Sequence, residues 1–214
     1  GGLEYLFGAV VEGDGAPRFH DWWAHDRAEE KQAFEGFIDF LLERRAAHPD
    51  MRVYHYAPYE VAAIKRLAGR HGTREDALDE LLRGDVFVDL YRVVRQSVRL
   101  GAPDLSIKTI ERLYRPKREG AVSTAGDSVV AYHEFLESAE PRDWRRSDRL
   151  KAIRDYNLDD CVSTLDLAKW LRARAAEHEI VWAPAESDAP PSDSETPSDS
   201  DAPLKPRERR AALA

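Results

Sequence analysis

The sequence has little cysteine and no long apolar run. Cys161 is the only cysteine in 214 residues, so an internal disulfide is excluded and a cysteine-rich zinc site is disfavoured. No apolar segment approaches the ~20 residues that a membrane-spanning helix needs. The first residues also lack the basic region and apolar core of a signal peptide. We therefore expect a protein of the reducing cytoplasm that makes no membrane contact.

Basic residues are absent from positions 186–201, which hold six acidic residues. Removing these six negative charges changes the formal charge of the chain from −8 to about −2. The remainder of the chain is therefore nearly neutral. Such a charge neither excludes a polyanionic partner nor argues for one.

Composition divides the chain into three parts. Residues 1–182 have the apolar content of a folded domain, whereas 183–206 are rich in Pro, Ser, Asp and Ala. The second segment cannot bury enough surface to offset its chain entropy, so we expect a disordered acidic linker. Residues 207–214 are helix-prone again and predict the start of a following domain. Because the first residue is Gly rather than Met, we also expect the chain to be a piece of a longer polypeptide.

The apolar pattern of the first part predicts an α/β fold. We expect strands at 3–11, 16–24, 51–57 and 85–91, and helices at 26–48, 58–72, 73–84, 105–114, 126–139 and 147–178. Asp26 is a candidate N-cap, and Pro58 and Gly72 suit the start and end of a helix. A hairpin followed by strands that alternate with helices predicts a mixed sheet with helices packed on it.

The first candidate for chemistry is the pair Tyr156 and Asp160 in the sequence YNLDD. Side chains at i and i+4 share one helix face, about 5–6 Å apart at Cβ. Asp160 is therefore a candidate metal ligand. The Tyr156 hydroxyl, which stays protonated at neutral pH, is a candidate for orienting a metal-bound water. The alternative is that Tyr156 is a half-buried core residue and that Asp159 and Asp160 are solvated.

The second candidate is Glu60, in the first turn of the helix that follows the predicted strand at 51–57. A carboxylate near a helix N-terminus, at the carboxyl end of a strand, lies where α/β proteins place ligand sites. The alternative is that Glu60 only interacts favourably with the helix dipole.

Two stretches, HYAPYE (55–60) and YNLDDC (156–161), resemble motifs of the YprB-type ribonuclease H-like domain of the DEDD exonuclease superfamily. The matching residues are His55, Tyr59 and Glu60 in the second family motif and Tyr156 and Asp160 in the third. The commoner second motif, His-Asn-x-x-Phe-Asp, has Asp where this chain has Glu60. Asp155 stands where the histidine subgroup carries its His, so the resemblance implies the tyrosine subgroup. The similarity covers residues 1–175.

This resemblance implies a ribonuclease H-like mixed sheet flanked by helices and a 3′–5′ exonuclease activity on DNA or RNA. It implies two Mg²⁺ or Mn²⁺ ions, with Glu60 and Asp160 as metal ligands and Tyr156 as the residue that positions the water. Such domains often occur in bacterial proteins between a RecB-like nuclease part and a helicase part. Flanking domains of these kinds are therefore expected as partners.

The resemblance also has a gap. The family carries Asp-x-Glu on its first strand, and no such pair precedes the first predicted hairpin here. We expect that strand to lie ahead of Gly1, outside this chain. With only Glu60 and Asp160 as ligands, the chain itself is expected to bind metal weakly and to cleave poorly or not at all.

A basic cluster leads into YNLDD. Its members are Arg142, Arg145, Arg146, Arg149, Lys151 and Arg154. Four of them, Arg145, Arg149, Lys151 and Arg154, are our candidates for contacting nucleic-acid phosphates. The alternative is an ordinary solvated helix face in which the bases alternate with acids.

Two further acids have supporting roles in this interpretation. Asp89, at the end of a predicted strand, is assigned to structure or to support of the site, and Asp159 to support of the site. Three hypotheses stay open: a metal-dependent nuclease, a catalytically silent nucleic-acid-binding or scaffolding module with the same fold, and a generic α/β domain with chance matches.

Overall fold

The computed structural model describes residues 2–13, 15–116 and 125–180. The predicted linker at 183–206 and the predicted helix at 207–214 lie outside these residues. Within the described residues, no helix is long and apolar enough to cross a membrane.

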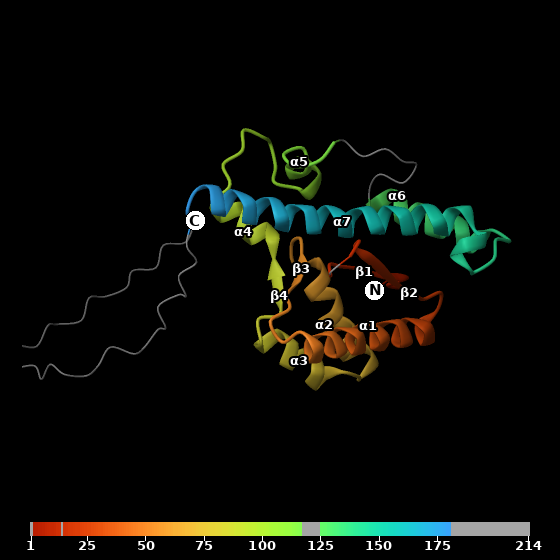
Figure 1. The fold of residues 1–214 in the computed structure, drawn as a ribbon. Helices are drawn as coiled ribbons and strands as arrows, with labels where there is room; N and C mark the ends of the chain where they lie inside the picture. The colour runs from red at the N-terminus through yellow and green to blue at the C-terminus, as the bar shows by residue number, and fades with distance from the viewer. Residues whose placement is uncertain (1, 14, 117–124, 181–214) are drawn as a thin grey trace, which may run out of the picture. The chain divides into compact units, whose positions relative to one another are not determined.

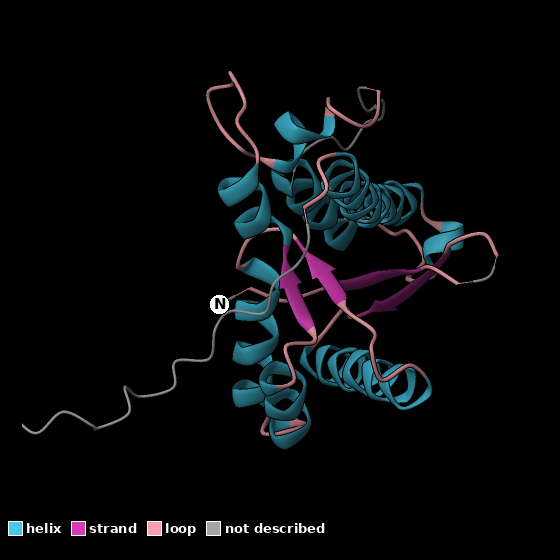
Figure 2. Ribbon diagram, turned by 60° about the vertical axis from the view of Figure 1, so that its left-hand side comes forward, coloured by secondary structure: helices cyan, strands magenta, loops and turns pink. Residues whose placement is uncertain are grey.

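The strands form two small sheets (Figure 2). Strand β1 (Leu6–Val11) pairs antiparallel with β2 (Arg18–Trp23), with Leu6 opposite Trp23. Strand β3 (Val53–His55) pairs in parallel with β4 (Phe87–Asp89). In the part of the chain that the structure describes, no strand pairing joins the two ladders. The predicted mixed α/β arrangement is present, but as two separate ladders.

Helices fill most of the remaining described chain. They are α1 (Arg27–Ala47), α2 (Tyr59–His71), α3 (Glu75–Arg83), α4 (Leu90–Ser97), α5 (Ile107–Glu111), α6 (Ala125–Glu137), the 3₁₀ turn η1 (Trp144–Arg146) and α7 (Asp148–Glu177). Helix α4 was not predicted. The predicted strand at 85–91 stops at Asp89 because the Asp89 carboxylate accepts a hydrogen bond from the Tyr91 N–H and so begins a helix.

Two predicted helix ends are confirmed. The Asp26 side chain accepts hydrogen bonds from the backbone N–H groups of Ala28 and Glu29 and so caps α1. Gly72 ends α2 in the left-handed conformation, at φ 57°, which glycine adopts without steric strain.

The sheets lie between helices, with α7 on one side and α1 on the other (Figure 1). Alternation along the strands explains this layering, because successive side chains point to opposite faces. Phe7 of β1 packs against Phe37 of α1, whereas Asp21 of β2 pairs with Arg154 of α7. The long helix α7 also contacts β3, so it passes over both ladders.

Three apolar clusters form the core. The first joins α1, α2 and α3 through residues that include Phe34, Ile38, Leu67 and Leu81. The second joins α4, α5 and α7 and includes Val94, Ile110 and Leu167. The third joins α6 to the start of α7 through Tyr132, Phe135, Leu150 and Ile153. Helix α7 takes part in two of the three clusters and therefore ties the later part of the described chain to the sheets.

A buried carboxylate connects α1 to α2. The Glu30 side chain is fully buried and accepts hydrogen bonds from the Glu4 backbone N–H, at 2.7 Å, and from His71, at 2.9 Å. Arg27 and Arg70 contact the same carboxylate at 2.9 and 3.1 Å. Burial by itself would raise the pKa of Glu30, but these donors outweigh it and hold the pKa below its ordinary value.

We predict that Glu30→Gln lowers the free energy of unfolding by about 3 kcal/mol or more, because the cations around this buried site lose their counter-charge. The exposed Glu43, on the same helix, offers a matched control, and Glu43→Gln should change stability by less than about 0.5 kcal/mol. Urea unfolding followed by circular dichroism measures both variants.

The lowered pKa of Glu30 also predicts that the stability of the protein depends on pH in the acid range. A carboxyl group whose pKa is lowered by folding stabilises the protein above its unfolded pKa, and that contribution is lost as the pH falls through the folded value. The stability of the wild type should therefore decrease below pH of about 4.3. Glu30→Gln should lack this component, and an identical pH profile for the two proteins would contradict the assignment.

Candidate functional site

Glu60 is placed by a tightly held turn between β3 and α2. Ala57 lies in this turn with a positive φ of 70°. Its N–H donates to Asp89 Oδ1 at 2.9 Å, and His55 Nδ1 lies 2.8 Å from its carbonyl oxygen. Asp89 therefore fixes this turn and caps α4 at the same time. The structure gives Asp89 a structural part, one of the two roles that the sequence suggested.

His55 and Glu60 are neighbours at the carboxyl end of β3. The His55 ring is 8 % exposed, and its Nδ1 lies 3.7 Å from Glu60 Oε2. Burial alone would lower the pKa of His55, but the interactions with Glu60 and with the Ala57 carbonyl raise it overall. The Glu60 carboxylate is 52 % exposed, so solvent and dissolved ions can reach it.

Tyr156 and Asp160 lie on α7, whose position over β1 depends on a glycine. A Cβ atom added at Gly8 would lie 1.8 Å from Asn157 Oδ1 and 2.9 Å from the Phe19 ring. A methyl group here would therefore require the Asn157 and Phe19 side chains to move. Because Asn157 lies between the two predicted site residues, this contact sets how deep they lie relative to β1.

Glu60 and Asp160 both lie within electrostatic reach of the half-buried Cys161 thiol. Burial raises the pKa of Cys161 to about 12, and the negative charges of Asp160 and Glu60 act in the same direction. Both carboxylates are therefore close enough to Cys161 for their charges to act on it. Although they are far apart in the sequence, α2 and α7 bring them to the same part of the fold.

Glu60 and Asp160 do not complete a metal centre on their own. Among the described residues, no group of three or more His, Cys, Asp or Glu side chains could hold a metal ion. A two-metal phosphodiester site needs more oxygen ligands than two carboxylates supply. The described residues therefore do not fit a two-metal site.

Tyr156 and Asp159 each meet a side chain from the α5 region. The Lys108 ammonium lies 5.6 Å from the centroid of the Tyr156 ring. Asp159 pairs with Arg115 at 2.6 Å. Sequence analysis did not single out Lys108 or Arg115, because no local pattern places them beside a helix more than forty residues later. Gly8, by contrast, did carry a signal, since glycine inside a strand often marks a close approach of another segment.

Most of the basic cluster is neutralised by acids. Arg145 pairs with Asp143, Arg149 with Glu134 and Glu140, and Arg154 with Asp21. The Arg154 guanidinium also stacks on Trp144 and Phe19, at 4.0 and 4.8 Å from the ring centroids. Lys151 is exposed. The structure thus places Arg154 in a packed contact rather than on a free basic surface.

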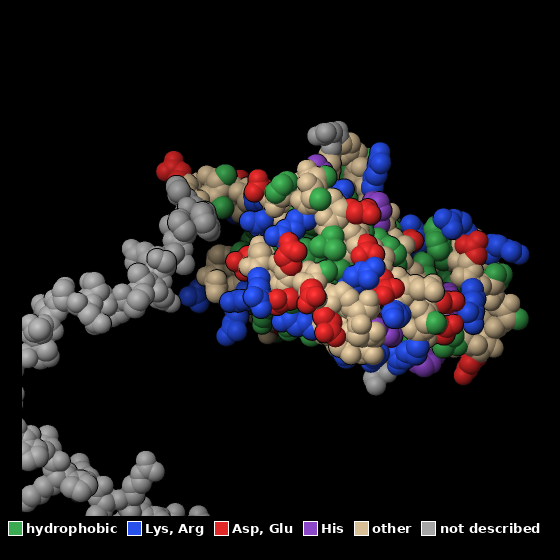
Figure 3. Space-filling model, turned by 90° about the horizontal axis from the view of Figure 1, so that it is seen from below, with side chains coloured by type: hydrophobic (Ala, Val, Ile, Leu, Met, Phe, Trp, Pro, Cys, Tyr) green, Lys and Arg blue, Asp and Glu red, His purple; other side chains and the backbone are tan. Residues whose placement is uncertain are grey.

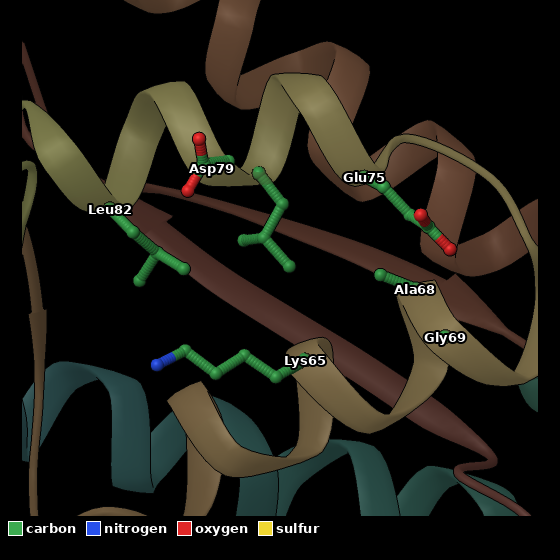
Figure 4. A pocket seen from close by; sticks show the side chains of 7 residues that line it. Lys65, Ala68, Gly69, Glu75, Asp79 and Leu82 are labelled. Atoms are coloured by element: carbon green, nitrogen blue, oxygen red, sulfur yellow. The ribbon is translucent and has the colours of Figure 1, made fainter.

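The hollow between α2 and α3 is lined by none of the predicted site residues. It is shallow, has a volume of about 330 Å³, and is lined by Lys65, Ala68, Gly69, Glu75, Leu78, Asp79 and Leu82 (Figure 4). On the face seen in Figure 3, acidic and basic side chains are intermixed. That face therefore offers no continuous basic surface for a polyanion.

Comparison with known proteins identifies the family. The model of the RNase H superfamily matches residues 1–172. The chain belongs to the RNase H superfamily. This match covers both ladders and most of α7, and it agrees with the mixed α/β architecture of helices and small sheets. No curated protein and no solved structure matches the chain.

The close approach at Gly8 makes a prediction about this RNase H-like fold. Gly8→Ala should lower the free energy of unfolding by about 1–3 kcal/mol, because the new methyl group overlaps the Asn157 side chain. Gly8→Ala combined with Asn157→Ala should recover part of this loss, since the overlapping oxygen is then absent.

Gly69 supplies the matched control, because a Cβ there would meet no atom within 4 Å. Gly69→Ala, within α2, should stabilise the protein by about 0.5–1 kcal/mol through helix propensity. Chemical denaturation measures the three variants and the wild type. Equal effects at Gly8 and Gly69 would show that the contact with α7 is unimportant.

Proposed function

We propose that this chain is a metal-dependent nuclease domain of the RNase H superfamily, a 3′–5′ exonuclease of the DEDD tyrosine subgroup that acts on DNA or RNA. The observation that carries the proposal is the contact of α7, the helix of Asp160, with β3, the strand that leads to Glu60, in a chain of this superfamily. The YprB-type motifs further support a larger cytoplasmic protein with flanking RecB-like nuclease and helicase parts.

In this proposal, Glu60 and Asp160 are metal ligands and Tyr156 positions a water molecule. Carboxylate oxygens are the ligands that Mg²⁺ and Mn²⁺ prefer. Two carboxylates supply fewer oxygens than a two-metal site needs. With these two ligands alone, we expect weak metal binding and weak cleavage or none.

The shortage of carboxylates favours a second candidate function. A chain with the same fold and an incomplete ligand set can bind nucleic acid, or join flanking enzymes, without cleaving a phosphodiester bond. The absence of any three-residue metal group among the described residues supports this silent module. Cleavage that depends on Glu60 and Asp160 separates the two candidates.

Calorimetric titration with Mn²⁺ tests the ligand set directly. We expect the wild-type chain to bind Mn²⁺ only in the millimolar range, about 10⁻³ M, since few protein oxygens replace the hydration shell of the ion. Glu60→Gln and Asp160→Asn should each weaken this binding further. Tight binding of two ions by the wild type would contradict an incomplete site.

A nuclease assay tests the chemistry. In Mn²⁺, a longer protein that contains this chain should shorten a 5′-labelled single strand from its 3′ end. Asp160→Asn and Glu60→Gln should each reduce the rate by about 100-fold or more, and Tyr156→Phe by about tenfold or more.

The exposed Asp79, on α3, provides the control: Asp79→Asn removes a carboxylate of similar exposure and should leave the rate unchanged. Circular dichroism confirms that each variant is folded. Full activity in Asp160→Asn would refute the proposed site, and no activity in the wild type would favour the silent module.

A further inference from the structure

Helix α4 begins beside the turn that leads to Glu60. The Asp89 carboxylate accepts hydrogen bonds from the Tyr91 N–H, in the first turn of α4, and from the Ala57 N–H, in the turn before α2. The Tyr56 and Tyr91 rings also meet edge to face, with their centroids 5.7 Å apart. The start of α4 is therefore fixed next to this turn, at the carboxyl ends of the parallel strands β3 and β4 (Figure 1).

One side of α4 is buried and the other is exposed. Leu90 and Val94 are buried and pack in the same apolar cluster as residues of α7. Arg92 and Arg95 are exposed, and their spacing of three residues places them on one side of the helix, with Cβ atoms about 5–6 Å apart. Arg99, which follows the end of the helix, is exposed as well. These three arginines form the α4 basic patch.

The α4 basic patch has no paired acid among the described residues. Positions 90–103 contain neither Asp nor Glu. In the part of the chain that the structure describes, none of the three guanidinium groups takes part in an ion pair or a side-chain hydrogen bond. Arginines elsewhere behave differently, since Arg74 pairs with Asp39 and Arg149 with Glu140. The patch thus differs from the basic cluster before α7, whose cations mostly have counter-charges.

Arginines without counter-charges are suited to bind phosphate. No neighbouring carboxylate cancels their charge, and each guanidinium can donate two parallel hydrogen bonds to one phosphate group. Helix α4 has 8 residues and is therefore about 12 Å long. This length exceeds the rise of about 3.4 Å between successive phosphates along a strand, so the patch can meet more than one phosphate.

We propose that the α4 basic patch binds the phosphates of a nucleic-acid strand next to the site of Glu60 and Asp160. The inference rests on the proposed function and adds to it the surface that holds the uncleaved part of the strand. Membership of the RNase H superfamily and the position of α4 beside the Glu60 turn favour nucleic acid over other anions. Neither the sequence motifs nor the basic cluster before α7 includes these arginines.

Strand binding tests the proposal without requiring cleavage. Fluorescence anisotropy gives the dissociation constant of a labelled oligothymidine over a range of salt concentrations in EDTA. Each of Arg92→Gln, Arg95→Gln and Arg99→Gln should weaken binding about fivefold at about 0.1 M salt, and the triple variant about 100-fold. The slope of log affinity against log salt should fall by about 0.7 for each arginine and by about 2 for the triple variant. Glutamine is a good helix former, and circular dichroism checks that α4 and the fold persist.

Two controls separate a phosphate contact from a structural role. Replacing all three arginines with lysine keeps the charges and should keep most of the wild-type slope. Arg83→Gln removes an exposed arginine of α3 that pairs with Asp79, and it should leave the slope unchanged. Arginines that act only on the helix dipole would change the free energy of unfolding but not the slope, and that result in the triple glutamine variant overturns the proposal.

Failure of this inference can be told from failure of the proposed function. An unchanged slope in the triple glutamine variant, together with loss of cleavage in Asp160→Asn, overturns the α4 basic patch alone. A wild-type chain that binds no strand also overturns the patch, while cleavage by the longer protein still decides the proposed function. A reduced slope without any cleavage supports the patch and assigns it to the silent module.

Anionic vesicles test the competing partner. Phosphatidylserine vesicles that bind the wild type but not the triple glutamine variant, with strand binding equal in both proteins, would assign the patch to a membrane surface and overturn the proposal.

Discussion

The position of α7 over β1 is the constraint on which the candidate site depends. The Asn157 side chain of α7 packs against β1 where Gly8 has no side chain. Tyr156 precedes Asn157, and Asp160 lies less than one turn beyond it, so one close contact fixes both residues. Protein cores are close-packed, so a methyl group added at Gly8 would displace α7 or the Asn157 side chain. A glycine in a strand thus affects where Tyr156 and Asp160 lie, on a helix that is distant in the sequence.

The turn and helix that carry Glu60 are held by a different set of contacts, which are electrostatic. Asp89 holds the turn at Ala57 before α2, and Glu30 holds the far end of α2 through Arg70 and His71. Both are carboxylates whose oxygens are taken up by donors. Asp89 and Glu30 thus fix the backbone on either side of α2, whereas Glu60, which lies beside His55, remains half-exposed.

The sequence predicted what depends on local chemistry and missed what depends on distant contacts. The cap at Asp26 and the helix end at Gly72 were predicted because short-range hydrogen bonding and backbone freedom decide them. Helix α4 was missed because the run of apolar residues through Phe87 and Val88 has a strand pattern that only the Asp89 cap interrupts. That Glu60 and Asp160 share one site stays a prediction from the resemblance, since no periodicity reports a contact across so long a separation.

Net charge is a poor guide to whether this chain binds nucleic acid. The basic residues that precede α7 are mostly paired with acids, and one of them, Arg154, is packed between rings. Such pairs attract a polyanion little, because each cation already has a counter-charge nearby.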